Sequence, residues 1–272
     1  QNSRLIISFT LFSAITSIVI SLMLPNIYTS KALLIPTNDE SSLGSQLGEY
    51  SSIAGLAGIS LPGSEGASKS KEAIARIKSY DFFVNEFLPN IRLENLMAVS
   101  SWNPKENKII YDDSIYDYKN KRWVRDVSYP YQPRPSKQEA YEIYRDILNI
   151  NEDQITLFVS ISIDHYSPNI SKSWVKLIVD NINNYMRKID KKFAENSISF
   201  LEETAQRTNI FQIKETISLL LEEQLQTLML AEASQNYIFE YIEMPRAPEK
   251  KSKPLRSVIV ILSTIFGFLI SA

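Results

Sequence analysis

The hydrophobic pattern is simplest near the two ends of the chain, where every helical face is apolar. Residues 5–24 read LIISFTLFSAITSIVISLML, a run without a charge, and Pro25 follows them. A helix of this length spans about 30 Å, the thickness of the hydrocarbon core of a bilayer. Residues 257–272 read SVIVILSTIFGFLISA, which reaches about 24 Å as a helix. Buried core helices are the alternative, but apolarity on all faces at both ends favours two membrane helices, the second truncated by the end of the sequence.

Three segments between these ends have the pattern of strands. Residues 28–36 (YTSKALLIP) follow the first apolar segment, and residues 237–243 (YIFEYIE) lie shortly before the second. Residues 155–163 (ITLFVSISI) alternate most regularly. Because the first and last of these strands are both tethered near the membrane, we expect them to pair with each other.

The segment from residue 169 to residue 244 contains neither glycine nor proline, and its apolar positions recur at intervals of three and four. This pattern predicts about 65 residues of amphipathic helix, about 100 Å long if straight. Ser167 and Pro168 are the expected N-cap and first helical residue. The apolar stripe weakens at residues 206–210, and the chain must return to the membrane. We therefore expect a helical hairpin that folds back there, with uncovered apolar stripes that favour lateral oligomerisation.

The remaining segments are shorter or less regular. Residues 69–87 have helical spacing, and Ser136 with Glu139 forms a capping-box sequence for a helix that ends near residue 148. Residues 41–70 hold nine serines and six of the seven glycines, a composition typical of a flexible loop. A glycine-rich phosphate cradle is the alternative there, but no Gly-Lys-Ser/Thr follows the glycines.

One region, residues 102–135, is rich in aromatic side chains and proline. Its aromatic residues include Trp102, Tyr111, Tyr116, Tyr118, Trp123, Tyr129 and Tyr131. Such side chains either stack on sugar rings or pack an irregular segment against the rest of a domain, and we favour the second interpretation.

Composition excludes several classes of function. The 272 residues include 29 Lys and Arg against 31 Asp and Glu, so the net charge of -2 gives no basic surplus for binding nucleic acid. The absence of cysteine excludes disulfides, zinc–thiolate sites, iron–sulfur clusters and thiol nucleophiles. The single histidine, His165, lies near Ser167, but no nucleophile elbow surrounds that serine. The acidic pairs at 112–113 and 222–223 are best explained as solvated charges. We predict no enzyme, no catalytic or metal-binding residues and no cofactor.

Together these elements predict an α+β fold, with a membrane-proximal α/β base and a long helical hairpin, bracketed by two transmembrane helices. The expected parts are transmembrane helix 1 at 1–27, the α/β base at 28–168 with the Ser/Gly-rich loop 41–70, the long helical hairpin at 169–236, the closing strand and proline-rich collar at 237–256, and the truncated transmembrane helix 2 at 257–272.

The order of several short segments resembles one family. Residues 237–248 read YIFEYIEMPRAP, and KSKP and an apolar segment containing Gly267 come after them. This order resembles the proline-rich signature of Wzz-like polysaccharide co-polymerases, the chain length determinants of bacterial surface polysaccharides. The first apolar segment with Pro25 and YTSKAL resembles the other end of that family, and the Ser-Pro-initiated helix with Trp174 and Asn183 lies between them. The spacing departs from the family, because Pro254 follows Pro248 by six residues with a basic run inserted.

The resemblance implies a two-pass protein of the bacterial inner membrane with a large periplasmic domain. The basic residues Lys250, Lys251, Lys253 and Arg256 would by the positive-inside rule place that domain in the cytoplasm, but the rule is weak for long loops. The resemblance also implies a ring-like homo-oligomer that acts with a membrane polysaccharide polymerase to set, without catalysis, the chain length of O-antigen or a related glycan. The growing lipid-linked glycan is a further candidate partner.

Two alternatives remain open from the residues alone. A two-span periplasmic sensor ectodomain would have the same membrane bracket. A hairpin adaptor of an export machine is disfavoured by the second span and by the lack of repeated short strands.

Two features near the second apolar segment are candidate functional sites. Pro245, Pro248 and Pro254 form a collar that stiffens the chain where the closing strand becomes a membrane helix, because each proline fixes φ and removes a hydrogen-bond donor. Ser263 and Gly267 form a small-xxx-small pair that permits the close approach of another helix. We expect that helix to belong to a sister subunit or to the polymerase.

Overall fold

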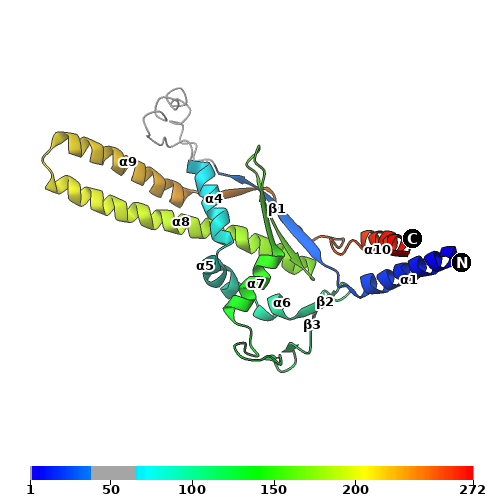
Figure 1. Cartoon of the computed structure of the whole chain (residues 1–272). Helices are drawn as coiled ribbons and strands as arrows, with labels where there is room; N and C mark the ends of the chain where they lie inside the picture. The colour runs from blue at the N-terminus through cyan, green and yellow to red at the C-terminus, as the bar shows by residue number, and fades with distance from the viewer. Residues whose placement is uncertain (1, 38–64, 272) are drawn as a thin grey trace.

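An antiparallel sheet lies at the centre of the molecule (Figure 1). The computed structural model describes residues 2–37 and 65–271, with side chains from 10–37 and 69–270. Within these residues the main sheet has four strands in the order β6-β7-β1-β8. Their bounds are Leu148–Glu152 for β6, Val159–His165 for β7, Tyr28–Pro36 for β1 and Phe239–Glu243 for β8.

The strand β1 forms where the sequence predicts it, and it pairs with the closing strand as expected. Ala32 and Leu34 are fully buried, whereas Lys31 and Ile35, which point to the other face of the sheet, are exposed. Ala32 lies opposite Ile161 of β7, and Leu34 lies opposite Tyr241 of β8. The alternation of β1 therefore presents one apolar face to the core while the strand joins the two ends of the domain.

The strand predicted at 155–163 begins later than its pattern indicates. Asp153 turns the chain, because its carboxylate accepts hydrogen bonds from the backbone N–H groups of Ile155 and Thr156. Leu157 has a φ of 58°, in the left-handed region, so the segment cannot continue as a regular strand until Val159. β6, which was not predicted, lies on the other side of this turn and pairs with β7.

Several short helices pack around the base beside the sheet. They are α4 (Glu65–Ile77), α5 (Tyr80–Phe82), the π-helical turn η2 (Phe83–Phe87), the 3-10 turn η3 (Leu88–Asn90), α6 (Leu93–Met97) and α7 (Lys137–Ile147). The helix predicted at 69–87 is interrupted, because the Ser79 hydroxyl accepts from the Phe82 N–H and starts a new turn. α7 begins with the predicted capping box, in which Ser136 and Glu139 each accept from the other's backbone N–H.

Aromatic rings and the first part of a long helix fill the core. Phe83, Phe87 and Tyr144 are fully buried. The ring centroid of Tyr144 lies 5.0 Å from that of Phe83 and 4.9 Å from that of Phe87. Trp174 packs edge-on against Phe87 with ring centroids 5.6 Å apart. Burial on this scale supplies most of the free energy that holds the base together.

The aromatic segment forms two small hairpins beside the base. They are β2 (Val99–Asn103) with β3 (Lys108–Tyr111), and β4 (Tyr116–Asp117) with β5 (Arg122–Trp123). Tyr111 stacks on Tyr118, and Tyr116 packs against Trp123. These side chains pack mainly on one another, and Trp102 packs edge-on against Tyr28 of β1 in the base.

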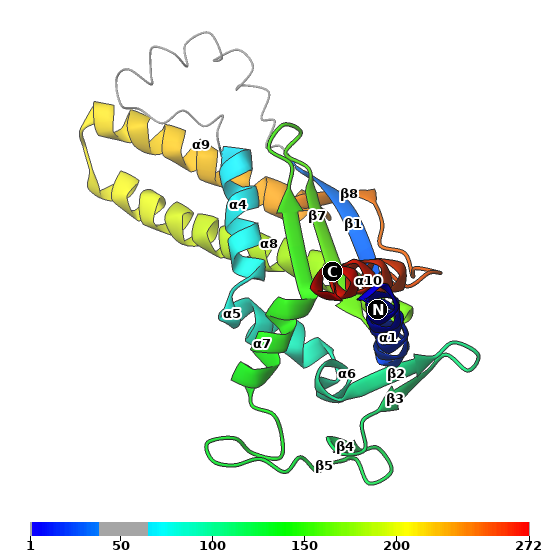
Figure 2. The same ribbon diagram turned by 45° about the vertical axis from the view of Figure 1, so that its right-hand side comes forward.

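The predicted hairpin consists of α8 (Pro168–Arg207) and α9 (Phe211–Ala233), which run side by side away from the base (Figures 1 and 2). The chain reverses at residues 208–210, inside the predicted interval. At 40 residues, α8 is about 60 Å long. Its base end is fixed by the Ser171 hydroxyl, which donates to the Ile163 carbonyl and accepts from the Ser30 N–H.

The two terminal helices, α1 (Asn2–Met23) and α10 (Arg256–Ser271), lie against each other at the opposite end of the molecule from the hairpin (Figure 1). In the part of the chain that the structure describes, no helix is long and apolar enough to cross a membrane. The mixed helix and sheet fold with a long helix is therefore confirmed, and the predicted bracket of two transmembrane helices is not. The Ser/Gly-rich loop at 41–70 falls mostly outside the described residues.

Candidate functional site

The junction between the base and the terminal helices contains the predicted proline collar, and Ser263 and Gly267 lie further along α10. β1 and β8 are neighbours in the sheet, so the connection from α1 into β1 runs beside the connection from β8 to α10. Between the sheet and the terminal helices, Ile27 and Lys253 form an isolated antiparallel bridge, in which the Ile27 N–H donates to the Lys253 carbonyl at 3.0 Å. The Ser252 N–H donates to the Ile27 carbonyl at 2.8 Å. The two connections are thus held together before either helix begins.

A buried carboxylate strengthens this junction. Asp164, which is 8% exposed, accepts a hydrogen bond from the Thr29 hydroxyl and an ion-pair contact from Lys253 Nζ at 2.6 Å. The Thr29 and Ser252 hydroxyl oxygens lie 2.6 Å apart. Three segments that are far apart in the sequence, β1, β7 and the collar, therefore meet at one charged group.

The collar prolines lie in the irregular segment between β8 and α10. Pro245 is buried, and Pro248 and Pro254 are half-buried. The carbonyl of Arg246 accepts a hydrogen bond from the Ser30 hydroxyl of β1 at 2.7 Å, so the start of the collar is attached to the sheet. The mechanical role predicted for the three prolines stays a prediction.

Ser263 and Gly267 contact the chain's own first helix. The Ser13 hydroxyl of α1 donates to the Ser263 carbonyl at 3.0 Å, and the two serine hydroxyl oxygens are 3.3 Å apart. A Cβ placed on Gly267 would lie 2.6 Å from Ser13 Cβ and 2.7 Å from Ser13 Oγ, closer than side chains approach. The small-residue face of α10 thus permits close helix packing, and α1 occupies it. The predicted contact with a sister subunit or a polymerase stays a prediction, and would use another face of α10.

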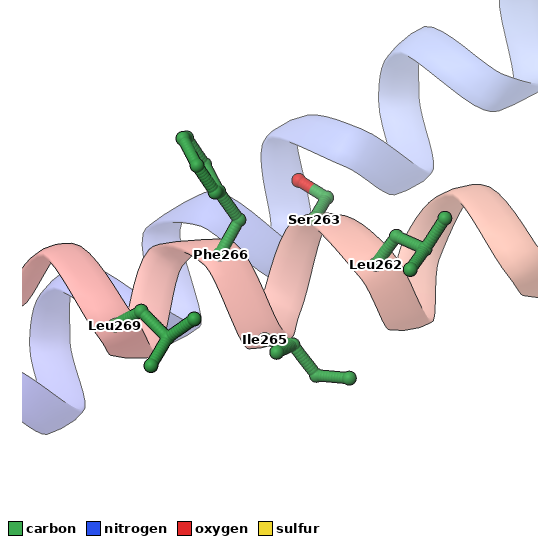
Figure 3. Close-up of a pocket in the computed structure, with 5 residues that line it drawn as sticks. All are labelled: Leu262, Ser263, Ile265, Phe266 and Leu269. Carbon is green, nitrogen blue, oxygen red and sulfur yellow. The ribbon is translucent and has the colours of Figure 1, made fainter.

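An open apolar pocket of about 430 Å³ lies along α10 (Figure 3). It is lined by Leu262, Ser263, Ile265, Phe266 and Leu269. α1 contributes a similar outward surface, in which Leu11, Phe12 and Leu22 are all mostly exposed. The helix pair therefore has small and hydroxyl side chains between its two helices and large apolar side chains on its outer surface.

The hairpin also exposes large apolar side chains. Its two helices are joined by an ion pair between Lys191 and Glu232 with an N–O distance of 2.8 Å. The side chains that point away from the partner helix include Phe193, Phe200, Phe211, Leu219 and Met229, all more than 60% exposed. Exposed apolar side chains in this number mark a surface that normally contacts another molecule.

His165 has a structural environment. It is 6% exposed, its Nδ1 accepts a hydrogen bond from the Ser167 N–H, and its Nε2 lies 2.9 Å from the Asn95 carbonyl oxygen. The backbone N–H requires a lone pair on Nδ1, so the neutral ring carries its proton on Nε2 and donates to Asn95. Burial lowers the pKa of His165 below its usual value, which favours this neutral form. The histidine connects α6 with the start of α8, where Ser167 is the residue before the helix as predicted but makes no side-chain cap.

The acidic pairs do not form metal sites in the described part of the chain, where no group of three His, Asp or Glu side chains is placed to hold a metal ion. Asp112 accepts hydrogen bonds from the hydroxyl and the N–H of Ser114, and these bonds lower the pKa of its carboxyl group. Glu222 and Glu223 are exposed on α9. Two of the aromatic residues considered for sugar stacking, Tyr129 and Tyr131, lie outside the two packed hairpins. Tyr129 is 97% exposed, and Tyr131 is also exposed.

Sequence reasoning missed the buried amide of Asn183 as a structural element. Its Oδ1 accepts from the backbone N–H groups of Ile238 and Phe239 at 2.8 Å each, and its Nδ2 donates to the Phe239 carbonyl at 2.9 Å. The amide therefore attaches α8 to the start of the closing strand. A polar residue between the buried Ile182 and Met186 of the apolar stripe was the available signal.

The fold and this junction define an α+β domain with a projecting hairpin and paired terminal helices, and solved structures of polysaccharide co-polymerases are among those similar to it. A full-length bacterial polysaccharide co-polymerase matches with a TM-score of 0.34 at 12% identity, over 97% of this chain and 91% of that one. A fragment of WzzB, a polysaccharide co-polymerase from Salmonella Typhimurium, matches with a TM-score of 0.37 at 14% identity, over 84% of this chain and 100% of that one. A variant of the lipopolysaccharide O-antigen chain-length regulator WzzB of Shigella flexneri matches with a TM-score of 0.25 at 12% identity, over 83% and 100%.

These structures are of polysaccharide co-polymerases, the class that the sequence resembles. No protein-family model matches the chain, and no curated protein matches it either.

Proposed function

We propose that this protein is a non-catalytic regulator of the chain length of a bacterial surface polysaccharide, O-antigen or a related glycan. The observation that carries the proposal is the junction: the first and last strands of one sheet are neighbours and lead into two helices that pack on each other, while the hairpin projects from the opposite end (Figure 1). In this arrangement, the first and last segments of the order that resembles the co-polymerases lie next to each other in space.

The second part of the proposal is location in the bacterial inner membrane, as a two-pass protein with the base and hairpin in the periplasm. The outward apolar side chains of α1 and α10 support it, because a surface of this kind is unfavourable in water and favourable in hydrocarbon. The Ser13–Ser263 hydrogen bond also fits lipid, where a hydroxyl requires a partner within the protein.

The third part is assembly into a ring-like homo-oligomer that acts together with a membrane polysaccharide polymerase. The exposed apolar side chains along α8 and α9 support self-association, since one hairpin cannot cover its own outer faces. Mass measurement of the detergent-solubilised protein tests this part. We expect a single multiple of the protomer mass, and a protein that is only monomeric would remove it.

The glycan itself provides the central test. Deletion of the gene should change the modal length of the surface polysaccharide, seen as a shift of the ladder on a gel, and expression from a plasmid should restore it. A ladder that is identical with and without the gene would contradict the proposal. Release or formation of glycosidic bonds by the purified protein alone would contradict the non-catalytic part.

The contact between Ser13 and Gly267 allows a sharper test of the helix pair. Gly267→Leu should separate α1 from α10, because even a Cβ at this position meets Ser13, and should alter the ladder while the base stays folded. The double variant Gly267→Ala with Ser13→Gly should keep the wild-type ladder, since Ser13→Gly removes both atoms that a Cβ at 267 would meet and leaves Thr10 Cα at 3.9 Å. An unchanged ladder for Gly267→Leu at normal expression would place length control in the base and hairpin alone.

A further inference from the structure

A second pocket lies where α1 ends and α10 begins. It has a volume of about 400 Å³ and is open to the outside. Ile18 and Leu22 of α1 and Val260 and Ile261 of α10 form its apolar walls. Ser21, Arg256 and Ser257 are the polar residues that also line it. A pocket with two apolar walls and a cation at one end matches an amphiphilic anion better than a water-soluble one.

Two of these polar residues, Ser21 and Arg256, have buried donors without a hydrogen-bond partner among the described residues. Ser21 is 2% exposed, and its hydroxyl makes no hydrogen bond within the described residues. The Nε of Arg256 is buried and likewise has no acceptor there. Buried donors are almost always satisfied in native proteins, so two of them in one pocket indicate a missing acceptor.

The charge of Arg256 is not neutralised by a carboxylate in the described part of the chain. Its Nη2 donates to the Asn26 side-chain oxygen at 3.1 Å and to the Leu24 carbonyl at 3.4 Å, both neutral acceptors. Nearby, Lys253 is already paired with Asp164. Partial desolvation and the positive charge of Arg256 lower the pKa of Lys251, which shows that positive charge accumulates at this point.

We propose that this pocket binds the phosphate of an anionic phospholipid. Arg256 Nε and the Ser21 hydroxyl donate to the phosphate oxygens, and the apolar walls contact the first part of an acyl chain. Guanidinium groups suit phosphate because they combine charge with directed donors. The inference goes beyond the proposed function and rests on only one part of it, the location of the helix pair in a membrane.

Lipid retention by the purified full chain tests the proposal. The protein is extracted in mild detergent, incubated with phosphatidylglycerol, with diacylglycerol or with inorganic phosphate, and examined by native mass spectrometry. We expect phosphatidylglycerol to be retained in preference to diacylglycerol, which has the same chains without the phosphate. Because a hydrogen bond to a charged group contributes about 1.5–3 kcal/mol, Arg256→Gln should weaken retention roughly tenfold or more. Ser21→Ala should weaken it less.

The matched control is Lys250→Gln, which removes an exposed positive charge from the same basic stretch without touching the pocket. Retention by Arg256→Gln equal to that of the wild type, or equal retention of phosphatidylglycerol and diacylglycerol, would overturn the proposal. Inorganic phosphate that binds as tightly as the lipid would also overturn it, in favour of a free anion. None of these results depends on whether the protein regulates glycan length, which the ladder tests separately.

Discussion

The two halves of α8 have similar apolar patterns and different environments. In the first half, Trp174, Ile178 and Ile182 are at most 5% exposed, because the helix packs there on the sheet and on the aromatic core. In the second half, Phe193 and Phe200 are about two-thirds exposed, and α9 is the neighbour that the helix has there. An apolar stripe thus fixes which face of a helix must be covered, but the surface available decides whether one chain covers it.

This difference divides the energetics of the molecule. Burying a large apolar side chain contributes about 1.5–3 kcal/mol, so the base gains this free energy within one protomer. The distal hairpin gains this free energy of burial only when another surface covers its apolar side chains. We therefore expect substitutions in the first half of α8 to act on folding, and substitutions in the second half to act on assembly.

The largest effect is expected for Trp174→Ala in the base. Trp174 contacts the rings of both Phe87 and His165, at centroid distances of 5.6 and 4.9 Å. Its removal leaves a cavity between α8 and η2 that the fixed sheet cannot close. We expect the free energy of unfolding to fall by about 3–5 kcal/mol, measured by chemical denaturation. A loss below about 1 kcal/mol would mean that the base is not the stable half.

A somewhat smaller loss is expected for Asn183→Ala. The substitution removes three hydrogen bonds and leaves the Ile238 and Phe239 N–H groups and one carbonyl without their partner. We expect a loss of about 2–4 kcal/mol and faster hydrogen exchange in β8. The neighbouring Asn184 is exposed, so Asn184→Ala is the matched control and should be nearly neutral. Equal effects of the two variants would contradict the role of the buried amide.

These residues also show how far the sequence determines the result. β1, the pairing of β1 with β8 and the turn at 208–210 were predictable, since each follows from local pattern and from the tethering of both chain ends. The start of β7 was not, because the Asp153 turn overrides the alternating pattern. Gly267 was recognisable as a small contact residue. Its partner Ser13 was not, because 254 positions separate them and several serines of the first helix were equally suitable.

A pH-dependent loss of stability is expected from His165 in the base. Since burial lowers its pKa in the folded state, the unfolded chain binds the proton first as the pH falls below about 6.5. Folding stability should therefore be complete above that value and decrease below it, by up to about 1.4 kcal/mol per pH unit until the folded-state pKa is reached. His165→Gln should lack this contribution. Denaturation curves of both proteins between pH 7 and 5 compare the two slopes, and identical slopes would show that His165 does not titrate on unfolding.

The smallest effect on folding is expected at the end of the hairpin. Phe200 and Phe211 are 66% and 75% exposed, so Phe200→Ser and Phe211→Ser remove little buried area from the protomer. The free energy of unfolding of the isolated protomer should change by less than about 0.5 kcal/mol, as for most surface substitutions. The same two variants should shift the solubilised protein towards smaller assemblies, because each removes a large apolar contact from the uncovered hairpin face. Glu202→Ser, an exposed polar position between them, is the control and should leave the assembly intact. If the phenylalanine variants keep the full assembly mass, the protomers associate through another surface, and the exposed hairpin side chains bind a different partner.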